Sequence, residues 1–298
     1  MTKTGHTHKM ANLQQRTAPW YAARRGRLTA SNMGALLGVS KWTPRQVAYE
    51  RVTGKAKFVS NEAMVYGAAH EQDGVNAYQI LTGNKVDQAG LWTHPDHSWI
   101  AGSPDGLIGV DGLIEVKCPF YKRVPHQEVP TDYFVQMQVC MACTIRSYCD
   151  FVSWTELSDT TIHRVKFDIE LFDYLVPYWG QIYSAMEIGQ EKVPELSEKT
   201  LCEIRARVLE SMERNITRQH PVPLWCGSPP GHSDDDAAEN RKRPRTSSEE
   251  ESEHGPNKEQ RLWTETDEPA AVPGGGLPVA PVHADGQAEV PGQGVQAA

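Results

Sequence analysis

Apolar and polar residues alternate with helix-like and strand-like periods through the first three quarters of the chain. Helices are predicted over residues 29–38, 43–54, 61–82, 131–144, 170–188 and 197–216. Strands are predicted over residues 90–93, 99–102, 107–110, 113–118, 148–155 and 161–167. The order of these elements is helices, a meander of strands, a helix, more strands and two final helices. This order predicts a mixed α/β sheet flanked by helices.

Capping residues support these boundaries. Thr43-Pro44 supplies an N-cap and an N1 proline, and Asn61 caps the long helix that Gly83 ends in the C′ position. Asp111-Gly112, between two apolar runs, is a strong signal for a two-residue β-hairpin turn.

The composition changes after Trp225. Aromatic residues almost vanish, and proline, glycine and runs of like charge replace the periodic pattern. Such a segment cannot offset its ordering entropy by burying apolar surface. We therefore expect a flexible N-terminus over residues 1–15, one folded domain over residues 16–226 and a disordered tail over residues 227–298.

Composition describes an ordinary globular protein. Of its 298 residues, 39% are hydrophobic and 23% are charged, which is enough to bury a sizeable core. The net charge of −8 lies in the tail, which holds 14 acidic and 6 basic residues, so the body has no net charge. That neutral body leaves a nucleic-acid partner open.

Sequence signals for location are few. No apolar stretch reaches about 18 residues, and no secretory signal is recognised at the start, so we expect no membrane association. Six cysteines in a chain of this length favour a reducing, intracellular compartment. The basic cluster Arg241–Arg245 fits a nuclear import signal and a solvated charge patch equally well.

The chemistry-bearing segment is Ser103-Pro104-Asp105-Gly106, followed by Glu115-Val116-Lys117. In a strand, Glu115 and Lys117 point to one face, and the hairpin returns them beside Asp105. Two carboxylates can hold Mg²⁺ while positions stay open for phosphate and water, and a nearby lysine orients or deprotonates that water. A surface hairpin with an ordinary Glu–Lys pair is the alternative for the triplet alone.

The long helix adds a third carboxylate. Met64, Ala68, Glu71, Val75 and Tyr78 are three or four residues apart, so they share one helix face. Glu71 is therefore expected to point inward within an apolar stripe, where it needs a metal or a lysine as partner. The alternative is a glutamate at the helix edge that reaches solvent.

Five motifs in order resemble the lambda-type exonucleases of viral recombination systems, members of the restriction-endonuclease-like, PD-(D/E)XK, superfamily. They lie between about Trp20 and Met186: Trp20-Tyr-Ala-Ala-Arg24-Arg-Gly-Arg-Leu-Thr-Ala-Ser31, Tyr66-Gly-x-x-x-Glu71, Ser103-Pro-Asp105-Gly, Glu115-Val-Lys117-Cys-Pro and Tyr133-x-x-Gln136-x-Gln138. The resemblance implies a restriction-endonuclease-like mixed central sheet flanked by helices.

The same resemblance implies roles for single residues. Asp105, Glu115 and the Val116 carbonyl oxygen become the metal ligands, and Lys117 handles the nucleophilic water. Glu71 becomes the additional active-site carboxylate, and Gln136 supports the site from the following helix. Gln138 competes for that last role, although the register from Tyr133 favours Gln136.

Arg24, Ser31 and Ser103 are implied to bind the terminal 5′-phosphate of a DNA end. A predicted helix start at Thr29 and Ser31 agrees, because free N–H groups there attract phosphate, and Arg24 can add a bidentate contact. Arg25 and Arg27 are alternatives to Arg24. The stretch between Lys117 and Gln136 is short for this family, so a DNA-approaching loop is expected to be trimmed.

The residues thus predict an Mg²⁺-dependent deoxyribonuclease, with Mn²⁺ as a substitute, and the resemblance implies that it digests linear duplex DNA from its 5′ ends. Its 3′ single strands would serve recombination or viral DNA replication. The resemblance implies double-stranded DNA ends and a single-strand annealing or recombination protein as partners, and is compatible with a homotrimer. A structure-selective endonuclease and a non-cutting DNA-end-binding adaptor are the alternatives.

Overall fold

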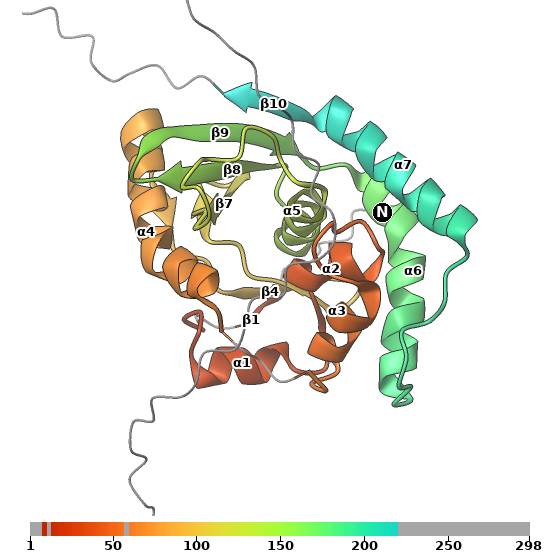
Figure 1. Cartoon of the computed structure of the whole chain (residues 1–298). Coiled ribbons are helices and arrows are strands. Elements are labelled where there is room, and N and C mark those ends of the chain that lie inside the picture. The colour runs from red at the N-terminus through yellow and green to blue at the C-terminus, as the bar shows by residue number, and fades with distance from the viewer. Residues whose placement is uncertain (1–7, 11–12, 57–59, 220–298) are drawn as a thin grey trace, which may run out of the picture. The chain divides into compact units, whose positions relative to one another are not determined.

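The computed structural model describes residues 8–10, 13–56 and 60–219 (Figure 1). The predicted tail 227–298, its basic cluster Arg241–Arg245 and residues 1–7 and 11–12 of the predicted N-terminal arm lie outside the described residues. No helix in the described part of the chain has the length and apolar character needed to cross a membrane.

Seven helices occur in the described residues: α1 (Ala18–Arg24), α2 (Ala30–Leu36), α3 (Arg45–Val52), α4 (Glu62–Thr82), α5 (Thr131–Thr144), α6 (Ile169–Glu187) and α7 (Glu198–Asn215). The bounds of α5 agree with its predicted range. Asn61 caps α4 by accepting a hydrogen bond from Met64 N, and Gly83 ends it in the left-handed conformation at φ 71°.

One local prediction at the N-terminal side was wrong, and one short helix there was missed. The N-cap of α3 is Pro44, one residue after the predicted Thr43. Helix α1 was not predicted, because it has seven residues and buries only Trp20, so it shows no apolar period.

A mixed six-stranded sheet forms the centre of the domain. Its order is β10 (Ile216–Gln219), β9 (Ser158–Lys166), β8 (Tyr148–Thr155), β7 (Gly112–Lys117), β6 (Gly106–Ile108) and β3 (Val86–Asp87). Only the β7–β8 pair is parallel, and α5 supplies the crossover between these two strands. The expected mixed sheet flanked by helices is therefore confirmed.

A second, smaller sheet joins segments that are distant in the sequence. Its order is β1 (His8–Met10), β4 (Leu91–Thr93), β5 (Ile100–Gly102) and β2 (Leu28–Thr29). Its parallel β2–β5 pair places the start of α2 beside the segment that leads to Asp105. Strands of two or three residues carry too little alternation to be predicted as pairs.

The hairpin between β6 and β7 exists, but its turn differs from the prediction. Ile108 pairs with Gly112, so the loop has three residues, Gly109–Asp111, and Gly112 belongs to the strand. Gly109, the first residue of this loop, has a φ of 53°, in the left-handed region that glycine adopts without strain. The side chain of Tyr148 lies against Gly112, where an added Cβ would sit 2.3 Å from a ring carbon.

The two faces of the large sheet bury different partners (Figure 1). On one face, Val75 and Tyr78 of α4 pack on Ile114 and Val116 of β7. On the other face, α5 packs on the sheet, and α2, α6 and α7 pack around α5. The alternation along β7 thus directs Leu113, Glu115 and Lys117 toward α5.

Candidate active site

Asp105 continues the β-ladder just before β6 begins. Its backbone N–H donates to the Ile114 carbonyl at 3.2 Å. Its carboxylate accepts from the Val116 N–H at 2.7 Å. A carboxylate thus replaces the next main-chain partner of β7, which fixes Asp105 beside Glu115.

Glu115 is the buried centre of the site. Its residue is 1% exposed on the sheet face that α5 covers. The same oxygen, Oε1, accepts from Lys117 Nζ at 2.5 Å and from Gln136 Nε2 at 2.6 Å. The other oxygen, Oε2, is buried and has no hydrogen-bond partner.

Lys117 lies between the carboxylates and an aromatic ring. Its Nζ is 4.6 Å from the centre of the Tyr133 ring on α5, a cation–π contact. Burial lowers the pKa of Lys117, but the charges of Glu115 and Asp105 outweigh it, so the net shift is upward. Tyr133 had no role in the sequence prediction. Its three-residue spacing from Gln136 places both side chains on one face of α5, and this spacing was the available signal that Tyr133 lies at the site.

The two glutamines of α5 serve different purposes. Gln136 reaches Glu115, as the register predicted. Gln138 is 1% exposed, donates to the Lys166 carbonyl at 2.8 Å and accepts from Asp168 N at 2.8 Å. Gln138 therefore joins the end of β9 to the start of α6 and does not reach Glu115.

Glu71 faces the site from α4 but is less buried than the periodicity predicted. Met64 and Ala68, which share its predicted apolar stripe, are exposed, and only Val75 and Tyr78 are buried. The first half of this helix face is open, so the Glu71 side chain is 26% exposed.

The partner of Glu71 is an arginine that the sequence did not suggest. Arg16 Nη2 forms an ion pair with Glu71 Oε2, and Arg16 Nη1 donates to the Ala68 carbonyl at 3.5 Å. Arg16 precedes the first motif and belongs to no periodic pattern, so nothing local marked it.

Negative charge accumulates at this position. Burial, the charge of Glu115 and the charge of Glu71 together raise the pKa of Asp105 well above its ordinary value. Carboxylates held this close oppose one another's ionisation unless a cation neutralises them. Lys117 supplies part of that positive charge.

The arrangement fits a bound divalent metal ion. The buried, unpartnered oxygen of Glu115 is a free ligand atom. The Val116 N–H points to Asp105, and the N–H and C=O of a strand residue point the same way, so the Val116 carbonyl is directed to that side. Among the described residues, no three His, Cys, Asp or Glu side chains form a metal-binding group. Mg²⁺ suits such a site, because it is commonly held by one or two carboxylates with waters and substrate phosphate.

The residues predicted to bind a 5′-phosphate are only partly brought together. Trp20 Nε1 donates to Ser103 Oγ at 2.9 Å, and the Arg24 guanidinium lies 4.1 Å from the centre of the Trp20 ring. Burial lowers the pKa of Arg24 to about 10. Ser31 is exposed, and among the described residues no hydrogen bond joins it to Arg24 or Ser103.

Contacts separate Arg24 from its two alternatives. Arg27 donates to the Ser98 carbonyl at 3.1 Å and to the Ala23 carbonyl at 2.6 Å, so it ties loops together. Arg25 is exposed at the C-cap of α1. Arg24, inclined over Trp20 and half-buried, is the arginine connected to Ser103 and hence to Asp105.

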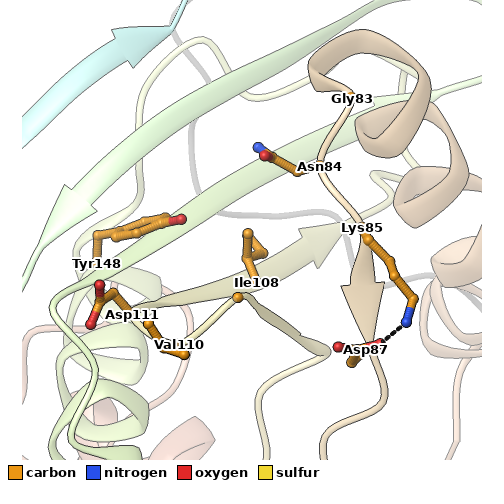
Figure 2. A pocket seen from close by; sticks show the side chains of 9 residues that line it. Gly83, Asn84, Lys85, Asp87, Ile108, Val110, Asp111 and Tyr148 are labelled. Carbon is orange, nitrogen blue, oxygen red and sulfur yellow. Dashed lines mark ion pairs between the residues drawn. The ribbon is translucent and has the colours of Figure 1, made fainter.

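A surface pocket of about 540 Å³ lies at the opposite end of the hairpin. Figure 2 shows Tyr148 and Asp111 on one side of it and the Lys85–Asp87 ion pair on the other, with Ile108 between them. Strand β7 leads away from this pocket, from Gly112 to Lys117. The pocket therefore does not include the carboxylates.

Comparisons with known proteins match the part of the chain that holds the candidate site. Residues 19–147 match the family model of the YqaJ-like viral recombinase domain. The uncharacterized protein R354 of Acanthamoeba polyphaga mimivirus is 26% identical over 162 residues, which are 48% of this chain and 30% of R354. The chain thus spans less than a third of the length of that curated relative.

Two solved structures are also similar. An alkaline exonuclease (LHK-Exo) from Laribacter hongkongensis is 29% identical, with a TM-score of 0.48 over 65% of this chain and 99% of that chain. A phage-related exonuclease from Haemophilus somnus 129PT is 13% identical, with a TM-score of 0.40 over 60% of this chain and 95% of that chain. The family match includes Arg24, Glu71, Asp105, Glu115, Lys117 and Gln136 and leaves Arg16 outside.

Proposed function

We propose that the chain, whose residues 19–147 match the family model of the YqaJ-like viral recombinase domain, is a metal-dependent deoxyribonuclease acting on the ends of linear duplex DNA. The observation that carries this proposal is the convergence of Asp105, Glu115, Lys117 and Gln136 around an unpartnered, buried carboxylate oxygen. A surface hairpin with an ordinary Glu–Lys pair does not require such an arrangement.

The residues divide the work of phosphodiester hydrolysis. Asp105, Glu115 and the Val116 carbonyl oxygen would hold Mg²⁺, with Mn²⁺ as a substitute. When bound there, the metal would supply polarisation of the scissile phosphate and a lowered pKa of water. Lys117 orients the attacking water, and Gln136 holds Glu115 in the orientation that leaves Oε2 free. Glu71 is the additional carboxylate at the open edge of the site.

Polarity depends on the end-binding residues. Arg24 and Ser103, connected through Trp20, provide a guanidinium and a hydroxyl for a terminal 5′-phosphate, with Ser31 as a further contact. Digestion from the 5′ end leaves a 3′ single strand. Such a product suits a single-strand annealing or recombination partner in viral DNA replication, and a homotrimer would keep the enzyme on its DNA.

The primary test uses the full chain and 5′-phosphorylated linear duplex DNA. Wild type, Lys117→Ala and Asp105→Asn are compared with Mg²⁺, with Mn²⁺ and with EDTA, and covalently closed circles serve as a second substrate. We expect nucleotide release from linear DNA by the wild type alone, in either metal. Cutting of closed circles would favour a structure-selective endonuclease, and end binding without cleavage would favour an adaptor.

A second test concerns polarity. Duplexes labelled at one 5′ or one 3′ end are digested by wild type, Arg24→Ala and Arg25→Ala. We expect early release of the 5′ label, a preference for 5′-phosphate over 5′-hydroxyl ends, and loss of that preference in Arg24→Ala only. Early release of the 3′ label would contradict the proposed direction and leave nuclease activity itself intact.

A further inference from the structure

The segment before α1 is held in an uncommon backbone conformation beside the carboxylates. Arg16 has a φ of 66°, in the left-handed region that residues with a side chain rarely adopt. Such conformations persist where surrounding contacts enforce them, and they gather at functional sites. The neighbours of Arg16 are correspondingly fastened: Gln15 Nε2 donates to the Pro104 carbonyl at 2.9 Å, and Thr17 Oγ1 donates to the Gln14 carbonyl at 2.7 Å.

These contacts attach the segment to two of the three parts of the chain that carry site carboxylates. Pro104 directly precedes Asp105, and Arg16 pairs with Glu71 and the Ala68 carbonyl on α4. The guanidinium of Arg16 thereby lies at the edge of the site, next to the additional carboxylate. Its position depends on contacts across 52 to 89 residues of sequence.

The stability of an exposed ion pair does not by itself explain why Arg16 is held in this backbone conformation. The Arg16 side chain is 47% exposed, and ion pairs in solvent contribute little to stability. A DNA strand that approaches the carboxylates of Glu71, Asp105 and Glu115 meets repulsion at its phosphates. Arg16 is a cation at that edge on a partly exposed side chain, and guanidinium binds phosphate with two parallel hydrogen bonds.

We propose that Arg16 is a substrate-binding residue, which contacts a backbone phosphate of the DNA strand beside the cleavage position while Glu71 holds its guanidinium in place. This inference rests on the proposed nuclease function for the identity of the ligand. It adds a phosphate contact that lies outside the matched domain of residues 19–147.

The experiment measures DNA binding without cleavage. Fluorescence anisotropy with a labelled 5′-phosphorylated duplex, in EDTA, gives the affinity of wild type, Arg16→Ala, Arg16→Lys and Arg51→Ala across a series of salt concentrations. Arg51 is an exposed arginine of α3, so its removal changes net charge equally. Thermal unfolding of each variant reports whether it folds.

A lost phosphate contact reduces the slope of log K against log salt by about 0.9. For Arg16→Ala, we expect that reduction of the slope and about tenfold weaker binding at moderate salt. For Arg16→Lys, we expect the wild-type slope. For Arg51→Ala, we expect no change in affinity or slope. An unchanged slope in folded Arg16→Ala overturns the inference, and so does an equal loss in Arg51→Ala. A wild type that binds but never cuts contradicts the nuclease proposal and not the Arg16 contact. A wild type that binds no DNA overturns both.

Discussion

Gln136 donates a 2.6 Å hydrogen bond to Glu115 Oε1, the oxygen that also accepts from Lys117, and Glu115 Oε2 is left without a partner. Both donors on one oxygen fix the carboxylate plane. The other oxygen, Oε2, is thereby left as a buried acceptor that is available to a ligand. A helix residue thus sets the orientation of a strand carboxylate, which is the usual task of residues that support metal ligands.

Substitution of the two glutamines on α5 should separate activity from stability. Gln136→Ala is expected to reduce nuclease turnover by about 10–100-fold, the range for lost partners of metal ligands, with little change in unfolding temperature. Gln138→Ala should instead lower stability by about 1–3 kcal/mol, because Lys166 O and Asp168 N lose a buried partner. Steady-state kinetics and denaturant unfolding of both variants measure this. If Gln136→Ala and Gln138→Ala lost the same activity and had the same stability, the assignment of Gln136 to the site and of Gln138 to the fold would be contradicted.

Divalent metal should stabilise the folded chain through Glu115. A ligand that binds only the native state adds about 2.7 kcal/mol at 100 times its dissociation constant. We expect Mg²⁺ to raise the unfolding temperature of wild type and to have little effect on Glu115→Gln, whose amide cannot supply a second charged ligand oxygen. Differential scanning fluorimetry with a Mg²⁺ titration measures this rise in unfolding temperature. Ser103→Ala is the control, and we expect it to show the same rise as wild type. The same shift in Glu115→Gln would place the metal elsewhere.

Acid should weaken the junction of α6 and α7 through Asp168. Burial raises the pKa of this carboxyl, but hydrogen bonds from Ser211 and Leu171 N and the charge of Arg214 outweigh it, so the net shift is downward. A depressed native pKa means that its contribution is full above the unfolded value of about 3.9 and is lost as pH falls through the native value.

Denaturant unfolding of wild type and Asp168→Asn between about pH 3 and pH 7 tests this. The variant should be less stable by about 1–2 kcal/mol at neutral pH, as for a lost helix N-cap, and the gap should narrow in acid. Asp159→Asn, at an exposed position of β9, should show no such gap. A gap that stays constant down to pH 3 would show that Asp168 is not the titrating group.

Two glycines of the same helix should respond oppositely to alanine. A Cβ on Gly74 would lie 2.4 Å from Val116 Cγ1 on the strand that carries Glu115, whereas a Cβ on Gly67 meets nothing within 4 Å. Gly74→Ala should therefore cost about 1–3 kcal/mol through overpacking. Gly67→Ala should stabilise by about 0.4–1 kcal/mol, because the unfolded chain loses freedom. Unfolding free energies of both variants measure the contrast, and a stabilising Gly74→Ala would mean that α4 shifts freely on the sheet.

Local patterns determined much of the architecture. The bounds of α5, the capping of α4 and the shared face of Glu115 and Lys117 follow from periods of 3.6 and 2 residues and from cap residues. These features depend on neighbours within a few residues. The pairing of the β6–β7 hairpin was predicted for the same reason, although a three-residue loop replaced the expected Asp111-Gly112 turn.

Only the tertiary structure decided how the site is assembled. The Arg16–Glu71 ion pair joins positions 55 residues apart, and Gln136 meets Glu115 across 21 residues. The small sheet that joins β2 to β5 likewise has no local signal. Such contacts arise when packing brings separate segments together, and neither periodicity nor capping records which segments meet. The sequence therefore predicted most of the candidate site residues, and the packing of α4, α5 and the N-terminal segment determined how their charges are arranged.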